Sequence, residues 1–146
     1  MESSARPEQL LFASSHVVID DTDFPVVTAR FVGVPDRAEF GAFLEGALGL
    51  LRRRQPFVTI IDARQGGMLP FAYIKDAGAW LTQHGRTRAV YSRGTALVLP
   101  GPVQRTVLSA VLALAPMGDT YEVFKDVAAA SAWAVRVLGR PIALGD

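Results

Sequence analysis

The sequence has 146 residues, which fits one domain with a single core, and it contains no cysteine, which excludes disulfides and cysteine-ligated zinc. Half of the residues are hydrophobic, 20% are charged and the formal net charge is +1, so the chain can fold by apolar burial, and general nucleic-acid binding has no support from composition. Because no run of about 18 apolar residues occurs and the N-terminus has no basic, apolar leader, we expect a cytoplasmic protein that is not an integral membrane protein.

The predicted elements alternate along the chain. Runs rich in β-branched or apolar residues predict strands over residues 16–20, 24–32, 57–61, 95–99 and 121–124. Apolar spacing, caps and opening prolines predict helices over about 36–53, 70–84, 102–114 and 127–138. The fold class is therefore α/β, with the order β-β-α-β-α-β-α-β-α: a mostly parallel sheet of about five strands, an antiparallel edge hairpin and four helices. We expect one domain over 15–140, after a flexible lead (1–14) and before a tail (141–146).

This order resembles that of a known family, with Phe57-Val-Thr-Ile-Ile-Asp62 as the central strand leading to a loop and a helix. The resemblance is to the STAS family, the domains of anti-sigma-factor antagonists and sulfate-transporter tails, over about residues 16–139. The chain also resembles the branch of this fold that includes Sec14-type lipid-binding domains, whose final helix carries an Ala-x-x-Trp-like segment such as Ala130–Trp133. The STAS resemblance implies a bacterial-type signalling regulator that recognises a protein through the loop after Asp62 and the following helix.

Signalling members of that family carry a phosphorylated Ser or Thr in this loop. Here Asp62 is followed by Ala-Arg-Gln-Gly-Gly, which has no hydroxyl group. Phosphate acts on binding through its charge and its hydrogen bonds, and this loop offers no side chain to receive it. We therefore expect partner binding without the phospho-switch.

The predicted partner-binding site combines this loop with the helix after it. The carboxyl end of a parallel strand is where open α/β sheets place ligand contacts. Tyr and Trp are favoured interface anchors, and the apolar arc of the helix is wider than one sheet face needs. The predicted residues are Asp62, Arg64, Gly66, Gly67, Tyr73 and Trp80. In the alternative interpretation, Asp62 satisfies loop amides and both rings pack around the edge of the core.

Two further surfaces are candidates for contact. The ends of the first two helices would gather a possible anion-binding pole of arginines: Arg52, Arg53, Arg54, Arg86, Arg88 and Arg93. The same arginines could instead complement the helix dipoles and solubilise the surface. The predicted helix 102–114 is apolar nearly all round, so either other elements cover it on two sides or it pairs with a second copy in a homodimer.

Catalytic and metal-binding residues are not predicted. The only histidines, His16 and His84, are expected at the wrong end of the sheet to serve Asp62, and no pair has ligand spacing. We expect no catalytic residue, metal or cofactor. The first functional hypothesis is a non-catalytic module that binds a protein partner of unknown identity. The alternatives are a small-ligand or lipid carrier with an apolar pocket beneath the loop and, with least support, an enzyme of unknown type.

Overall fold

The computed structural model describes residues 10–99, 101–102 and 120–139. Its centre is a six-stranded sheet whose spatial order follows the chain. The strands are β1 (Phe12–Ala13), β2 (Val17–Asp20), β3 (Val26–Gly33), β4 (Phe57–Gly66), β5 (Ser92–Val98) and β6 (Tyr121–Phe124). The pairs β1–β2 and β2–β3 are antiparallel, and every later pair is parallel. The mostly parallel sheet with an antiparallel edge is thus confirmed.

The sheet has six strands instead of the expected five or so. The additional strand is β1, which lies inside the segment 1–14 that the sequence assigned to a flexible lead. Phe12 pairs with Ile19 of β2, and its ring meets the ring of Phe43 edge-on at 6.5 Å. The aromatic contact with α1 thus adds to the pairing of β1 with β2.

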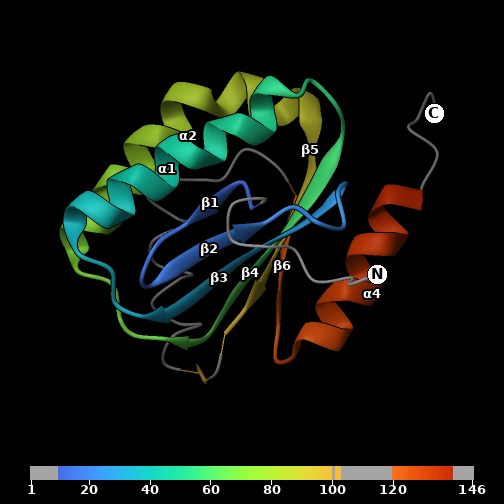
Figure 1. The fold of residues 1–146 in the computed structure, drawn as a ribbon. Coiled ribbons are helices and arrows are strands. Elements are labelled where there is room, and N and C mark those ends of the chain that lie inside the picture. Colours follow the sequence, from blue (N-terminus) through green and yellow to red (C-terminus); the bar gives the residue numbers. More distant parts are fainter. Residues whose placement is uncertain (1–9, 100, 103–119, 140–146) are drawn as a thin grey trace.

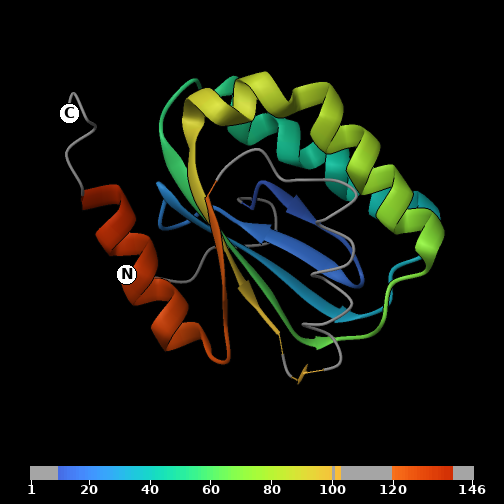
Figure 2. The same cartoon turned by 180° about the vertical axis from the view of Figure 1, so that it is seen from behind.

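The helices cover both faces of the sheet. Helices α1 (Arg37–Arg52) and α2 (Phe71–Tyr91) lie on one face, and α4 (Val127–Gly139) lies on the other (Figures 1 and 2). The expected start of α1 is confirmed, because the side chain of Asp36 accepts a hydrogen bond from the Glu39 amide at 2.8 Å. Beyond Pro102, the expected helix 102–114 and the dimer contact assigned to it lie outside the described residues. No helix in the described ranges is long and apolar enough to cross a membrane.

Helix α2 ends at Tyr91 and not, as expected, near His84. The last turns are held because Arg88 is buried, with 7% of its surface exposed, and Tyr91 packs on the core beside Phe57. Tertiary contacts of this kind outweigh the weak helix propensity of Gly85. The additional turns of α2 place the side chain of Arg88 between this helix and the sheet.

Side chains of β4 alternate between the two faces of the sheet. Phe57 packs beneath α1 and α2, together with Leu50, Leu51 and Ile19. Val58 and Ile60 pack on the opposite face against α4, whose buried residues are Ala130, Trp133, Ala134 and Val137. By the same alternation, Asp62 lies on the α4 face of the sheet and Ile61 on the face of α1 and α2.

Candidate functional site

The carboxylate of Asp62 is occupied by two arginines. Asp62 is only 2% exposed, and Arg64 donates to it from Nε and Nη2, each at 2.9 Å. Arg30, its neighbour on β3, places Nε 3.5 Å from Asp62 Oδ2. The hydrogen bonds from Arg64 are the largest cause that lowers the pKa of Asp62, so the carboxylate is ionised and internally neutralised.

The six predicted partner-binding residues do not form one surface. Asp62 and Arg64 lie on the α4 side of the sheet, whereas Tyr73 and Trp80 belong to α2 on the opposite side. Tyr73 is 9% exposed and its ring stacks on that of Phe40, with centroids 5.2 Å apart. Trp80 packs against the same layer of the core. Both rings therefore pack on the core, as the alternative interpretation expected. The role of Tyr73 and Trp80 in binding a partner stays a prediction.

Gly66 and Gly67 lie at the end of β4, against the end of β3. Gly67 donates to the carbonyl of Gly33 at 3.1 Å, and a Cβ at Gly67 would lie 2.6 Å from Cγ2 of Val34. A side chain at Gly67 would therefore displace Val34, so this position is closely packed against the end of β3. The Gly67 amide is bonded to Gly33, so this glycine has a packing role at this edge.

Three of the arginines assigned to the anion-binding pole have other contacts. The C-termini of α1 and α2 do reach the same end of the molecule (Figure 1). However, Arg53 pairs with Asp21 and lies 4.5 Å from the ring centroid of Phe24, and Arg93 donates to the carbonyl of Val90 at 3.0 Å. Arg88 is buried. The arginines left exposed at this end are Arg52, Arg54 and Arg86.

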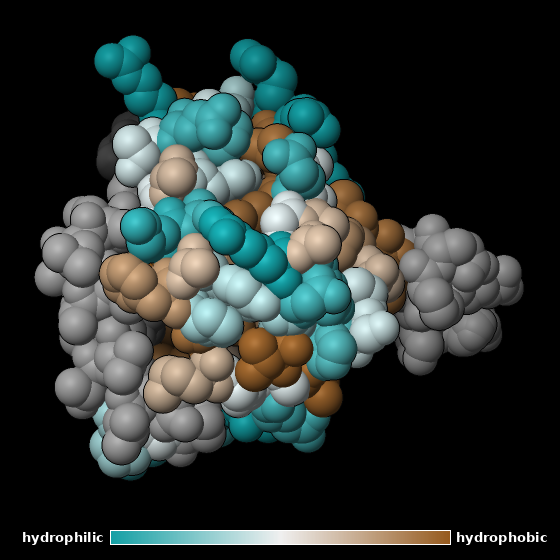
Figure 3. All heavy atoms as spheres, turned by 90° about the vertical axis from the view of Figure 1, so that its left-hand side faces the viewer, coloured by the Kyte–Doolittle hydropathy of each residue, from teal (hydrophilic) through white to brown (hydrophobic). Residues whose placement is uncertain are grey.

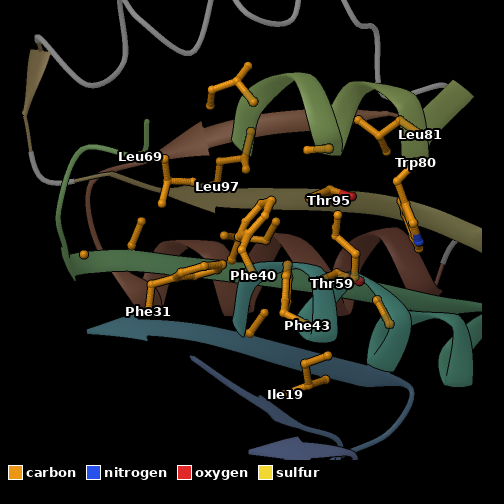
Figure 4. A pocket seen from close by; sticks show the side chains of 18 of the residues that line it. Ile19, Phe31, Phe40, Phe43, Thr59, Leu69, Trp80, Leu81, Thr95 and Leu97 are labelled. Atoms are coloured by element: carbon orange, nitrogen blue, oxygen red, sulfur yellow. The ribbon is translucent and has the colours of Figure 1, made fainter. Parts of the chain in front are cut away.

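A cavity of about 280 Å³ lies between the sheet and the layer of α1 and α2 (Figure 4). Strands β2 to β5 form its floor, and the two helices and the start of the loop after β4 form its walls. Most of its described lining is apolar, and the aromatic and aliphatic side chains labelled in Figure 4 are Ile19, Phe31, Phe40, Phe43, Leu69, Trp80, Leu81 and Leu97. The cavity therefore offers an apolar surface inside the fold.

The polar groups of the lining gather at one end of the cavity. Thr59 of β4 and Thr95 of β5 are register partners on neighbouring strands, and in Figure 4 both lie toward the end where Trp80 descends from α2. Arg88 lines the same cavity and donates from Nη2 to Oγ1 of Thr95 at 3.3 Å. Its guanidinium lies 6.0 Å from the ring centroid of Trp80. Nε1 of Trp80 is buried and has no hydrogen-bond partner among the described residues.

This cluster was not predicted from the sequence, because Arg88 was expected at the anion-binding pole. A usable signal was present: Arg88 follows Leu81 by seven residues, which returns to nearly the same side of a helix. The expected helix end near His84 hid that relation. Likewise, Thr59 and Thr95 are the polar residues of two otherwise apolar runs.

His16 lies at the same edge of the sheet as the end of β3, because β2 is antiparallel to β3. Val32 donates to the carbonyl of His16 at 2.9 Å, which corrects the expectation that His16 lies at the opposite end from Asp62. His16 Nδ1 lies 2.8 Å from Glu39 Oε1, while Ser14 bonds to Oε2. These contacts, that of Ser14 first, lower the pKa of Glu39 to about 2. Since Ser14 and His16 both bond to Glu39, the three do not form a nucleophile–base relay.

Comparison with known proteins gives the fold. No family model matches the sequence, and no curated protein matches it at a significant level. A solved structure from Shewanella loihica PV-4, of a DUF3478 family protein with a SpoIIAA-like fold, superimposes with a TM-score of 0.55 at 18% identity. The match covers 84% of this chain and 98% of that one. The chain therefore has the SpoIIAA-like fold, in agreement with the STAS-like domain that the sequence analysis expects.

Proposed function

We propose that the protein is a non-catalytic carrier or sensor that binds a small, largely apolar molecule in the cavity beneath α1 and α2. The observation that supports this proposal is the cavity of about 280 Å³ with its nearly continuous apolar lining. Protein interiors are close-packed and contain few voids larger than a water molecule. A volume of this size, close to the lower limit of about 300 Å³ for small-ligand sites, suits a ligand better than a packing defect.

The energetics favour an occupied cavity. Residual cavity volume destabilises a protein by about 24 cal/mol per Å³, so a ligand that fills even a third of this cavity would stabilise the fold by roughly 2 kcal/mol. Water would gain little, because the described lining offers it few hydrogen-bond partners. The lining therefore favours a ligand with a largely apolar surface.

A fluorescent, uncharged probe tests the proposal. N-phenyl-1-naphthylamine should bind with one-to-one stoichiometry and an increase in emission. Ala77 lines the cavity, so Ala77→Phe should lower probe affinity about tenfold or more by filling the space. Ala79, on the same helix, is exposed, and Ala79→Phe is the matched control that should bind as the wild type does. Equal binding by all three folded proteins would remove the basis for a ligand in the cavity.

A second candidate function, the partner-binding module expected from the sequence, is supported by a different observation. At the end of the molecule where β3 and β4 terminate, several large apolar side chains are exposed: Val32, Val34, Met68 and Phe71. Figure 3 shows this end, with hydrophobic side chains between hydrophilic ones. Phe71 is 65% exposed and Met68 53%, which makes them better contact residues than the buried Tyr73.

Self-association distinguishes this second candidate from the carrier. If two copies meet through this end, a Met68→Ser/Phe71→Ser variant should sediment as a monomer at concentrations where the wild type associates. The control is Val135→Ser, because Val135 is an equally exposed apolar residue on α4. The double variant should keep its affinity for the uncharged probe, since neither residue lines the cavity. Identical sedimentation of all three proteins would contradict self-association through this face.

A further inference from the structure

We infer that the ligand of the cavity is a neutral molecule with a carbonyl group, whose oxygen accepts a hydrogen bond from the hydroxyl of Thr59 while its apolar part lies along the apolar lining. This inference rests on the proposed carrier function and adds the chemical class of the ligand. It follows from a polar side chain that faces the cavity and has no hydrogen-bond partner in the described part of the chain.

Thr59 turns its side chain into the cavity from the middle of the sheet. It belongs to β4, which is paired with β3 on one side and with β5 on the other. Phe57 packs beneath α1 and α2, and side chains two positions apart on a strand share a face, so Thr59 lies on that face too. It lines the cavity and is only half-buried. Since strands flank it and helices cover this face, the exposed part of its side chain faces the cavity.

The hydroxyl of Thr59 makes no hydrogen bond to the described residues. Its register partner Thr95 differs, because it accepts a hydrogen bond from Arg88 at 3.3 Å, so both of those side chains are already engaged. A threonine hydroxyl can donate one hydrogen bond and accept others. A polar group enclosed without a partner costs free energy, which a ligand with a matching group recovers. Thr59 is therefore the group of the lining to which we assign the ligand.

A second group at the same end favours an acceptor on the ligand. Trp80 also lines the cavity, and its Nε1 is a buried donor with no acceptor among the described residues. Figure 4 places Trp80 and Thr59 toward the same end. An N–H without an acceptor leaves its positive end uncompensated, and an oxygen with partial negative charge is stabilised near it in apolar surroundings. A carbonyl oxygen, which only accepts, therefore suits this end better than a group that only donates.

The rest of the lining sets the charge and the size of the ligand. Toward the opposite end the labelled side chains are aromatic or aliphatic and end at Phe31 and Leu69 (Figure 4). An ion in such surroundings needs a counter-charge, whereas Thr59 offers a neutral hydroxyl. Dividing about 280 Å³ by roughly 30 Å³, the volume of one water in the liquid and close to that of a methylene, allows about nine such groups. A neutral carbonyl compound of about this size fits.

Two ligands that differ only in the carbonyl group test the inference. Butyrophenone is butylbenzene with an oxygen in place of the hydrogens on the carbon next to the ring, and both are uncharged and close to the expected size. Isothermal titration calorimetry measures the affinity of each for the wild type and for Thr59→Val, which removes the hydroxyl. We expect Thr59→Val to weaken butyrophenone about fivefold relative to butylbenzene, which corresponds to a hydrogen bond of about 1 kcal/mol.

Thr28→Val is the matched control. Thr28 is also half-buried and lies on β3, but it is the register partner of Ile60, which packs on the α4 face of the sheet. This variant should leave the ratio of the two affinities unchanged, and Thr59→Ser, which keeps a hydroxyl, should retain most of the preference. If Thr59→Val does not fold, Thr59→Ala removes the same hydroxyl and the ratio of the two affinities is still measured.

Infrared difference spectroscopy observes the hydrogen bond itself. A carbonyl that accepts a hydrogen bond has a lower stretching frequency than a free one. The stretch of bound butyrophenone should therefore lie at a lower frequency in the wild type than in the variant that lacks the Thr59 hydroxyl. Thr28→Val should give the wild-type frequency.

The outcomes separate this inference from the proposed function. A ratio of affinities or a carbonyl stretch that removal of the Thr59 hydroxyl leaves unchanged overturns the carbonyl inference, and butylbenzene binding that Ala77→Phe weakens keeps the carrier function in that case. If the fluorescent probe and both ligands bind without sensitivity to Ala77→Phe, or do not bind, the carrier function itself is overturned. A change of the ratio in Thr28→Val as large as in Thr59→Val would also overturn the inference, because it would show a general effect on the sheet.

Discussion

Arg64 holds Asp62 in a two-point ion pair although only one residue lies between them on β4. Two nitrogens of the guanidinium meet the two carboxylate oxygens at 2.9 Å each, and the Arg64 amide donates to Oδ1 at 3.2 Å. Arg64 thus bonds both oxygens of the carboxylate that was predicted to bind a partner, and that binding role stays a prediction. The acid therefore has an internal partner near the end of β4, and the cavity lies on the other face of the sheet.

The first prediction concerns the stability that this pair contributes. Asp62→Asn keeps the size of the side chain but removes the charged acceptor of Arg64 and Arg30, so the free energy of unfolding should fall by about 1–3 kcal/mol. Asp76→Asn is the control: Asp76 pairs with Arg37 on the surface, and exposed ion pairs of this kind contribute little to stability. Urea denaturation at pH 7 measures both. Equal losses in the two variants would contradict a special role of Asp62.

The second prediction concerns the acid stability that Glu39 gives. Its hydrogen bonds with Ser14 and His16 lower the folded-state pKa to about 2, from an ordinary value near 4.5. A lowered carboxyl pKa stabilises the folded state fully above the ordinary value, and this stabilisation is lost as the pH falls from about 4.5 through 2. The gap in melting temperature between the wild type and Glu39→Gln should therefore be constant near neutral pH and close in acid. A gap independent of pH would contradict this linkage.

The sequence patterns predicted the order of the elements better than their ends. The capping pair of Asp36 and Glu39 predicted the start of α1 because the cap is a local hydrogen bond. The end of α2 depends on the burial of Arg88 and Tyr91 under other elements. A window of sequence does not contain those contacts, so the expected helix ended near His84.

The candidate site was harder to predict, for two reasons. The run from Phe57 to Ile61 is apolar on both faces, so its period could not indicate which face Asp62 would share. The cavity arises where side chains of several elements fail to fill the space between two layers, and no local pattern records such a mismatch. Thr59 and Thr95 lie far apart in the sequence, and only the pairing of β4 with β5 brings their hydroxyls together at one end of the cavity.

The third prediction tests the packing of β1 on α1. A Cβ added at Gly46 would lie 3.1 Å from Cβ and Cδ1 of Phe12, whereas one added at Gly41 of the same helix meets nothing described within 4 Å. Gly41→Ala should therefore stabilise the protein by about 0.5–1 kcal/mol through helix propensity. Gly46→Ala should gain less or destabilise, because Phe12 must move. Chemical denaturation compares the two, and equal gains would mean that β1 is not packed against α1 in solution.

The fourth prediction concerns the opposite face of the sheet, where α4 lies on β5. A Cβ at Gly94 would lie 2.7 Å from Cη2 of Trp133 and 3.2 Å from the carbonyl oxygen of Thr120. Trp133 is buried and its ring meets that of Phe124 at 5.7 Å, so the indole cannot turn away without disturbing the core. We expect Gly94→Ala to lower the free energy of unfolding by about 1–3 kcal/mol, as overpacked sites do. Affinity for the uncharged probe should not change, because the sheet separates Trp133 from the cavity. A shift in probe affinity without a loss of stability would contradict this separation of the core into one part on each face of the sheet.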